Sequence, residues 1–112
     1  MIEGIIVATL TPYGRDGATE VGQVRENVRY LAEAGIPAIA PVGTTGEFPL
    51  LRQEEKRLLI RTACEAARGL MAVIAGVWAP QVEDIATLCR TAEEAGADAV
   101  FLTTPIYYSY RA

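Results

Sequence analysis

The segment Gly43–Glu47, with the sequence Gly-Thr-Thr-Gly-Glu, brings together residue types that could bind an anion. Glycine on each side of the two threonines, at Gly43 and Gly46, lets the backbone turn tightly and lets a ligand approach the amides closely. Thr44 and Thr45 offer hydroxyl and N–H donors suited to a carboxylate or an oxyanion. The alternative is a structural turn whose threonines satisfy local backbone groups, and for an isolated match this is the more frequent outcome.

Two tyrosines near the other end of the sequence strengthen the interpretation of the turn as a site. Tyr107 and Tyr108 follow an apolar segment, and a phenol beside a threonine hydroxyl can pass protons without a histidine. The sequence contains no histidine, which excludes Ser-His-Asp and Cys-His catalysis. For each tyrosine alone, packing or an interface is an equally good explanation.

The remaining candidates for chemistry receive structural interpretations. Lys56 is the only lysine, and it falls in a charged stretch where we expect a solvated helix face. A nucleophilic lysine needs burial or a cationic neighbour, and the adjacent Arg57 does not share its helix face. Cys64 and Cys89 lack metal-ligand spacing, so we expect two buried thiols, no metal and no cofactor.

Apolar patterning predicts the elements that must position these residues. Short runs rich in branched residues favour buried strands at 4–10, 37–42, 70–77 and 97–105. Apolar residues at helical spacing favour helices from about 20 to 35, at 52–69 and at 82–96. Each helix closes on a glycine, where a left-handed residue is favoured, at Gly35, Gly69 and Gly96.

The alternation of strands and helices predicts an α/β fold with a parallel sheet and right-handed crossovers. Strand starts recur about every 30 residues, as in βα repeats, and four units are about half of a (β/α)8 TIM barrel. An open doubly wound sheet is the alternative. Residues suited to chemistry follow several different strands, which favours a barrel mouth: Thr9, Thr11 and Tyr13, then the Gly-Thr-Thr-Gly turn, then Trp78, then the tyrosines. We therefore predict one incomplete barrel domain over residues 1–112.

Composition excludes several classes of partner. The net charge is −4 with both signs interspersed, so no basic stripe favours nucleic acid. No apolar run approaches the roughly 20 residues of a membrane span, and Glu3 stands where a signal peptide needs positive charge. We expect a cytoplasmic protein. The 51% hydrophobic content is high for a small soluble domain and predicts a further partner surface.

Together these features resemble the N-terminal half of the dihydrodipicolinate synthase and N-acetylneuraminate lyase family, the pyruvate-dependent class I aldolases. The matching landmarks, in order, are 4–13, 34–51, 54–60, 73–77 and 93–108. The resemblance implies a TIM barrel in which a lysine forms a Schiff base with pyruvate or another 2-keto acid. It implies that Gly43, Thr44, Thr45 and Gly46 hold the carboxylate. The segment Pro-Ile-Tyr-Tyr-Ser is nearer to the neuraminate lyase and sugar-acid aldolase branch than to the synthase branch.

The resemblance also implies a proton relay and an assembly. Thr44 would join tyrosines in the relay, and Tyr107, with Tyr108 as the alternate, would reach across a dimer interface of a homo-oligomer. The family's Schiff-base lysine lies on the sixth strand and its principal tyrosine on the fifth, and the 112 residues contain neither strand. We therefore expect this chain alone to be inactive.

Two other hypotheses remain open. A half-barrel with open edges could be a module that self-assembles or binds a partner. A sugar-phosphate barrel enzyme could use the turn on phosphate, although phosphate sites of barrels usually follow strands 7 and 8.

Overall fold

The computed structural model describes residues 1–106, which contain four strands, three α-helices and one short 3-10 helix. In chain order these are β1 (Ile6–Ala8), α1 (Val21–Glu33), β2 (Ala38–Ala40), η1 (Phe48–Leu50), α2 (Gln53–Ala67), β3 (Ala72–Gly76), α3 (Val82–Ala95) and β4 (Ala99–Phe101). None of the helices in this part of the chain has the length and apolar character needed to cross a membrane.

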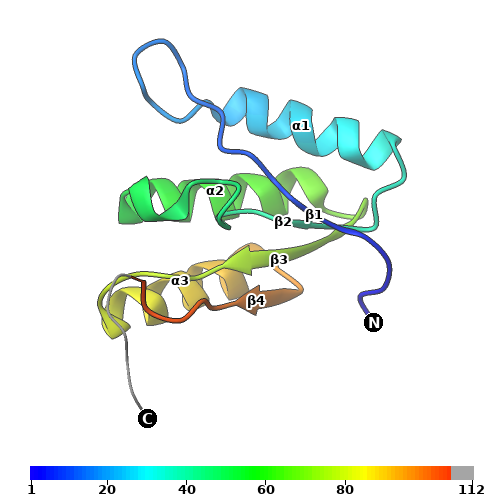
Figure 1. The fold of residues 1–112 in the computed structure, drawn as a ribbon. Helices are drawn as coiled ribbons and strands as arrows, with labels where there is room; N and C mark the ends of the chain where they lie inside the picture. Colours follow the sequence, from blue (N-terminus) through cyan, green and yellow to red (C-terminus); the bar gives the residue numbers. More distant parts are fainter. Residues whose placement is uncertain (107–112) are drawn as a thin grey trace.

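The strands form one parallel sheet in the order β1-β2-β3-β4. Each crossover advances by one strand in the same direction, and right-handed crossovers of this kind place every helix on the same face. Figure 1 shows the helices stacked in chain order beside the strands, and α2 packs against both α1 and α3. The predicted α/β fold with four parallel strands and three helices is confirmed.

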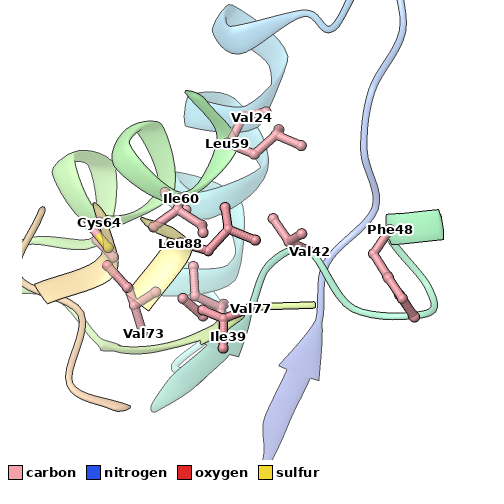
Figure 2. Packing of buried hydrophobic residues seen from close by; sticks show 14 of the residues in the cluster. Val24, Ile39, Val42, Phe48, Leu59, Ile60, Cys64, Val73, Val77 and Leu88 are labelled. Carbon is pink, nitrogen blue, oxygen red and sulfur yellow. The ribbon is translucent and has the colours of Figure 1, made fainter. Parts of the chain in front are cut away.

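The core lies between the helices and the sheet. Ile39 of β2 and Val73 of β3 pair in register and point toward the helices, where they meet Ile60 of α2 and Leu88 of α3 (Figure 2). All four side chains are buried. Because α2 lies between the other two helices, its apolar stripe contributes the largest share of this cluster.

The helices end as the sequence predicts. Gly35, Gly69 and Gly96 have positive φ angles of 75°, 74° and 85°, the left-handed conformation that glycine adopts without a steric penalty. The start of α2 has no serine or threonine cap. Instead, the Glu55 carboxylate accepts a hydrogen bond from the backbone N–H of Arg52 at 2.8 Å, which satisfies a donor at the helix start.

The prediction that the first strand is buried on both faces is wrong. Ile6 of β1 is 47% exposed, and Ile5 and Leu10 beside it are also exposed. Within residues 1–106, β1 pairs only with β2, so its other edge is open. The last strand, β4, has the same character, since Val100 is exposed on it and Leu102 is exposed directly after it.

The backbone that follows β2 presses directly against β3. Val42 has a φ of 61°, which is an unfavourable conformation for a branched residue, and it is one of two non-glycine residues with positive φ in the described part of the chain. The Gly76 N–H donates to the Pro41 carbonyl at 2.9 Å. A Cβ at Gly76 would overlap the Val42 carbonyl and lie 3.0 Å from the Phe101 ring. Glycine at 76 therefore permits the bend at Val42.

Replacing Gly76 by alanine should lower the free energy of unfolding by about 2–3 kcal/mol, because the added methyl forces backbone apart in a packed region. Urea denaturation measures this change. The matched control is Gly22→Ala in α1, where an added Cβ meets no atom within 4 Å. That control should raise stability by about 0.5 kcal/mol, through helix propensity. Equal effects of the two substitutions would contradict the close approach.

The cysteines provide a second test of the core. Both thiols are free; Cys64 is buried as predicted, whereas Cys89 is only half-buried. Burial raises the pKa of the Cys64 thiol from 9.0 to about 11; the negative charge of Asp98 adds to this increase and the positive charge of Arg68 opposes it. The thiol therefore keeps its proton in the folded chain at pH values where the unfolded chain releases it.

The stabilisation associated with this raised pKa is complete below pH 9.0 and is lost as the pH rises toward about 11. Between about pH 8 and pH 11, the free energy of unfolding of the wild type should fall by up to about 2 kcal/mol more than that of Cys64→Ala. Urea titrations of both proteins across this range give the difference. Parallel pH profiles would show that the Cys64 thiol ionises as freely in the folded chain as in the unfolded one.

Candidate functional site

The Gly-Thr-Thr-Gly turn lies at the C-terminal edge of the sheet, directly after β2 and the bend at Val42. The Gly46 N–H donates to the Gly43 carbonyl at 3.0 Å, and the Glu47 N–H donates to the Thr44 carbonyl at 3.0 Å. Gly43 and Gly46 are buried, whereas Thr44 and Thr45 are exposed. The turn is thus fixed by its glycines and presents both threonines at its surface.

The two glycines allow the ends of other strands to approach the turn. A Cβ at Gly46 would lie 3.1 Å from the Thr9 carbonyl oxygen, and one at Gly43 would lie 3.2 Å from the Phe101 ring. These neighbours come from the ends of β1 and β4 respectively. The turn therefore lies where the carboxyl ends of three strands come together, the place where ligands bind in parallel α/β sheets and barrels.

Thr11 ties the first of these strand ends to the turn. Its hydroxyl donates to the Gly46 carbonyl at 2.6 Å, and the side chain is buried. A buried hydroxyl needs such a partner, so the bond fixes the loop after β1 and the turn relative to each other. The predicted meeting of residues after the first strand with the turn is confirmed for Thr9 and Thr11.

Two acidic residues and a tyrosine lie beside the turn. Partial burial raises the pKa of Tyr13, and the negative charges of Glu47 and then Glu55 raise it further. Glu47 has a φ of 59° and an exposed side chain. The Tyr13 phenol, which is protonated at neutral pH in any case, keeps its proton to higher pH because of this shift and can donate a hydrogen bond beside the turn.

The prediction that Lys56 lies on a solvated helix face is wrong. The side chain is 3% exposed, and its Nζ donates to the Trp78 carbonyl at 2.9 Å. Burial lowers the pKa of this amine, while Asp84 on α3 acts in the opposite direction. The helical periodicity contains the signal: Lys56 precedes Leu59 and Ile60 by three and four positions, which places it on the apolar face of α2.

Phe48 and Trp78 connect this lysine to the turn. Their rings pack edge to face with centroids 5.3 Å apart, and the Lys56 ammonium lies 5.3 Å from the Trp78 ring centroid. The Phe48 N–H donates to the Gly43 carbonyl at 3.3 Å. Sequence reasoning named Trp78 but missed Phe48, because η1 is too short to show a periodic pattern.

Tyr107 and Tyr108, the other predicted site residues, lie outside the residues that the structure describes. Within the described part, no group of three or more histidine, cysteine, aspartate or glutamate side chains is arranged to hold a metal ion. The site available from residues 1–106 consists of the turn, Thr11, and the tyrosine and glutamates beside them.

Replacing Thr11 by valine keeps the shape of the side chain but leaves the Gly46 carbonyl without its donor. We expect a loss of about 1–2 kcal/mol in the free energy of unfolding, since the bond is buried. The matched control is Thr103→Val, whose hydroxyl donates to the neighbouring Thr104 carbonyl at 3.1 Å. The control should change stability by less than about 0.5 kcal/mol. Equal losses in the two variants, measured by urea denaturation, would show that the Thr11 hydrogen bond contributes no more to the free energy of unfolding than the control bond does.

Comparison with known proteins places this arrangement in a family. A sequence model described as the dihydrodipicolinate synthetase family matches residues 1–112. Proteins named 4-hydroxy-tetrahydrodipicolinate synthase match over 107 residues at 40% identity in Brucella abortus and 43% in Alcanivorax borkumensis. Each match covers 96% of this chain and 36% of the relative. The chain therefore spans about a third of the length of these relatives.

Solved structures agree. N-acetylneuraminate lyase from Mycoplasma synoviae superposes with a TM-score of 0.94 at 32% identity, covering 98% of this chain and 38% of that one. Dihydrodipicolinate synthase from Aquifex aeolicus gives 0.83 at 33% identity, covering 88% and 33%. These neighbours are TIM barrels, so the prediction of a partial TIM barrel is confirmed. Since the family's sequence model matches all of residues 1–112, the chain belongs to the dihydrodipicolinate synthetase family.

Proposed function

We propose that this chain is the carboxylate-binding part of a pyruvate-dependent aldolase, lyase or synthase. Its substrate is pyruvate or a related 2-keto acid, whose carboxylate is held by Thr44 and Thr45 of the Gly-Thr-Thr-Gly turn. Residues 1–112 form the N-terminal part of one TIM-barrel domain in this proposal. Its support from the sequence is the order of family landmarks, and its support from the structure is the turn itself.

The observation that carries the proposal is the contrast between the exposed threonines and the fixed backbone beneath them. Thr44 and Thr45 are exposed, while Gly43 and Gly46 are buried and hydrogen-bonded to each other. The Thr11 hydroxyl donates a hydrogen bond to the Gly46 carbonyl at 2.6 Å. Backbone amides on a turn held in this way need little rearrangement to meet a carboxylate, and the two threonine hydroxyls offer further donors.

The covalent step requires a lysine that these residues do not offer. In a Schiff base, a lysine amine adds to the keto carbon, and the keto oxygen leaves as water. Lys56 is the only lysine of the chain, and its Nζ is buried and bonded to the Trp78 carbonyl. We therefore assign the nucleophile to a part of the complete barrel beyond residues 1–112, and we expect this chain alone to be inactive.

Further parts of the proposal rest on the family resemblance. Thr44 would exchange protons with Tyr107, or with Tyr108 as the alternate, and Tyr107 would enter the site of a neighbouring subunit. The complete protein would be a cytoplasmic homo-oligomer that uses no metal or organic cofactor. The relatives are named as a synthase and as a lyase, so the proposal extends only to the keto-acid half of the reaction.

The exposed strands favour a second candidate, in which residues 1–112 act as a module that self-assembles or binds a partner. Large apolar side chains are exposed on β1 and β4 and in the segments beside them, at Ile5, Ile6, Leu10, Val100, Leu102 and Ile106. Open, apolar edges of a parallel sheet favour association. A monomer in sedimentation velocity would contradict this candidate and leave the first unaffected.

Trapping with pyruvate and borohydride tests the first candidate. The protein purified from its natural source should gain the mass of one reduced pyruvate unit per subunit. The 12.0 kDa chain alone should gain none on its one lysine, because that side chain is buried. Intact-mass spectrometry distinguishes these results, and peptide mapping locates the adduct. An adduct on Lys56 would contradict the inertness of this chain, and no adduct on the natural protein would contradict the proposed chemistry.

The matched variants are Thr45→Val and Thr87→Val in the natural protein. Thr45→Val should raise the pyruvate concentration needed for half-maximal trapping by about ten-fold, since a hydrogen bond to a charged group is lost. Thr87 lies on α3 and donates to the Glu83 carbonyl, away from the turn, so its variant should match the wild type.

A further inference from the structure

Lys56 is buried, and burial is unfavourable for a charged side chain unless its donors are paired. An ammonium removed from water loses several kcal/mol of hydration, and this loss is offset only when its donors find partners. Among residues 1–106, Lys56 finds such a partner in the Trp78 carbonyl at 2.9 Å and a weaker one in the Trp78 ring. Both interactions lead to the same residue, directly after β3.

The lysine reaches across two elements to make these contacts. It lies near the start of α2, and its backbone N–H donates to the Arg52 carbonyl at 3.1 Å in the first turn of the helix. Trp78 lies in the loop between β3 and α3. The Lys56–Trp78 bond therefore fixes the start of α2 to the carboxyl end of the neighbouring strand.

The same tryptophan contacts the Gly-Thr-Thr-Gly turn indirectly, through Phe48. Its ring packs edge to face on Phe48, at 5.3 Å between centroids, and Phe48 is buried. The Phe48 N–H in turn donates to the Gly43 carbonyl at 3.3 Å. A continuous series of contacts thus runs from Lys56 through Trp78 and Phe48 to the turn. Figure 2 shows Phe48 set apart from the main cluster, beyond Val42.

We propose that Lys56 is a positioning residue for the turn: its ammonium holds Trp78, and Trp78 holds Phe48 and the turn in place. It touches no substrate. This inference rests on the proposed function only for the role of the turn as a carboxylate site, because the mechanical connection exists without a ligand. It gives a reason for a buried cation in α2 that the chemistry itself does not use.

Amide hydrogen exchange in the ligand-free chain tests the connection. In Lys56→Met, which keeps the length of the stem and removes the ammonium, the Gly46 and Phe48 amides should exchange about ten-fold faster. Global stability should not fall in parallel, since the variant also removes a buried charge. The control is Arg61→Met on the same helix, where the side chain is exposed and the turn amides should keep wild-type rates. Wild-type exchange of the turn in Lys56→Met would overturn the proposal.

A second pair of variants tests the aromatic link independently and covers the case in which Lys56→Met does not fold. Trp78→Ala removes the ring but keeps the carbonyl, and it should speed the exchange of the turn amides to a similar extent. Trp78→Phe keeps a ring against Phe48 and should restore most of the protection. Slow exchange in Trp78→Ala, or no recovery in Trp78→Phe, would show that the ring does not carry the effect.

The hydrogen-exchange test of the positioning role and the pyruvate-trapping test of the proposed function can fail independently. Exchange is measured without pyruvate, so faster exchange in Lys56→Met supports the positioning role whether or not pyruvate binds. Failure of pyruvate trapping in the natural protein, together with this faster exchange, would reject the keto-acid function alone. Normal trapping together with unchanged exchange would reject the positioning role alone.

Discussion

The contact between the Val42 carbonyl and Gly76 decides how the mouth of this sheet is built. The chain leaves β2 in a left-handed conformation that is unfavourable for valine, and it can do so only because β3 has no side chain at that point. Strain of about 1–3 kcal/mol persists only when the surroundings over-determine it. Here two interactions keep Val42 in its strained conformation: the hydrogen bond from the Gly76 N–H to the Pro41 carbonyl, and the packing of the buried Val42 side chain. The turn, Phe48 and the start of α2 follow in their observed places.

Much of this arrangement could be predicted from local patterns. Branched apolar runs mark all four strands, and helical spacing with a closing glycine marks all three helices, because secondary structure in a parallel α/β sheet follows burial closely. The residues alone put the turn directly after the second strand, and the resemblance to a family added its expected role as a carboxylate site. The strands are shorter than the apolar runs that predict them. In β1 only Ile6–Ala8 pair with a neighbour, because a strand extends only as far as its hydrogen bonds and the outer edge of β1 has no partner within residues 1–106.

The features that escaped prediction are those set by contacts between distant segments. A left-handed valine contradicts the preference of its own residue type, so no local pattern indicates it. The charged neighbours of Lys56 in the sequence indicate a solvated position, whereas its spacing from Leu59 and Ile60 puts it on the buried face. The Thr11 bond to Gly46 spans 35 positions and depends on the parallel pairing of β1 and β2.

The two ends of the sheet differ in the connections between its strands and the helices. At the amino ends of the strands, each helix returns through a short connection with a left-handed glycine, at Gly35, Gly69 and Gly96. At the carboxyl ends, longer segments at 9–20 and 41–52 carry the threonines, the glutamates and the strained backbone. Substitutions at the two ends therefore affect different properties of the protein. The glycine-closed end can preserve the architecture over evolutionary time, while the opposite end can acquire new substrate preferences through loop changes that leave the scaffold intact.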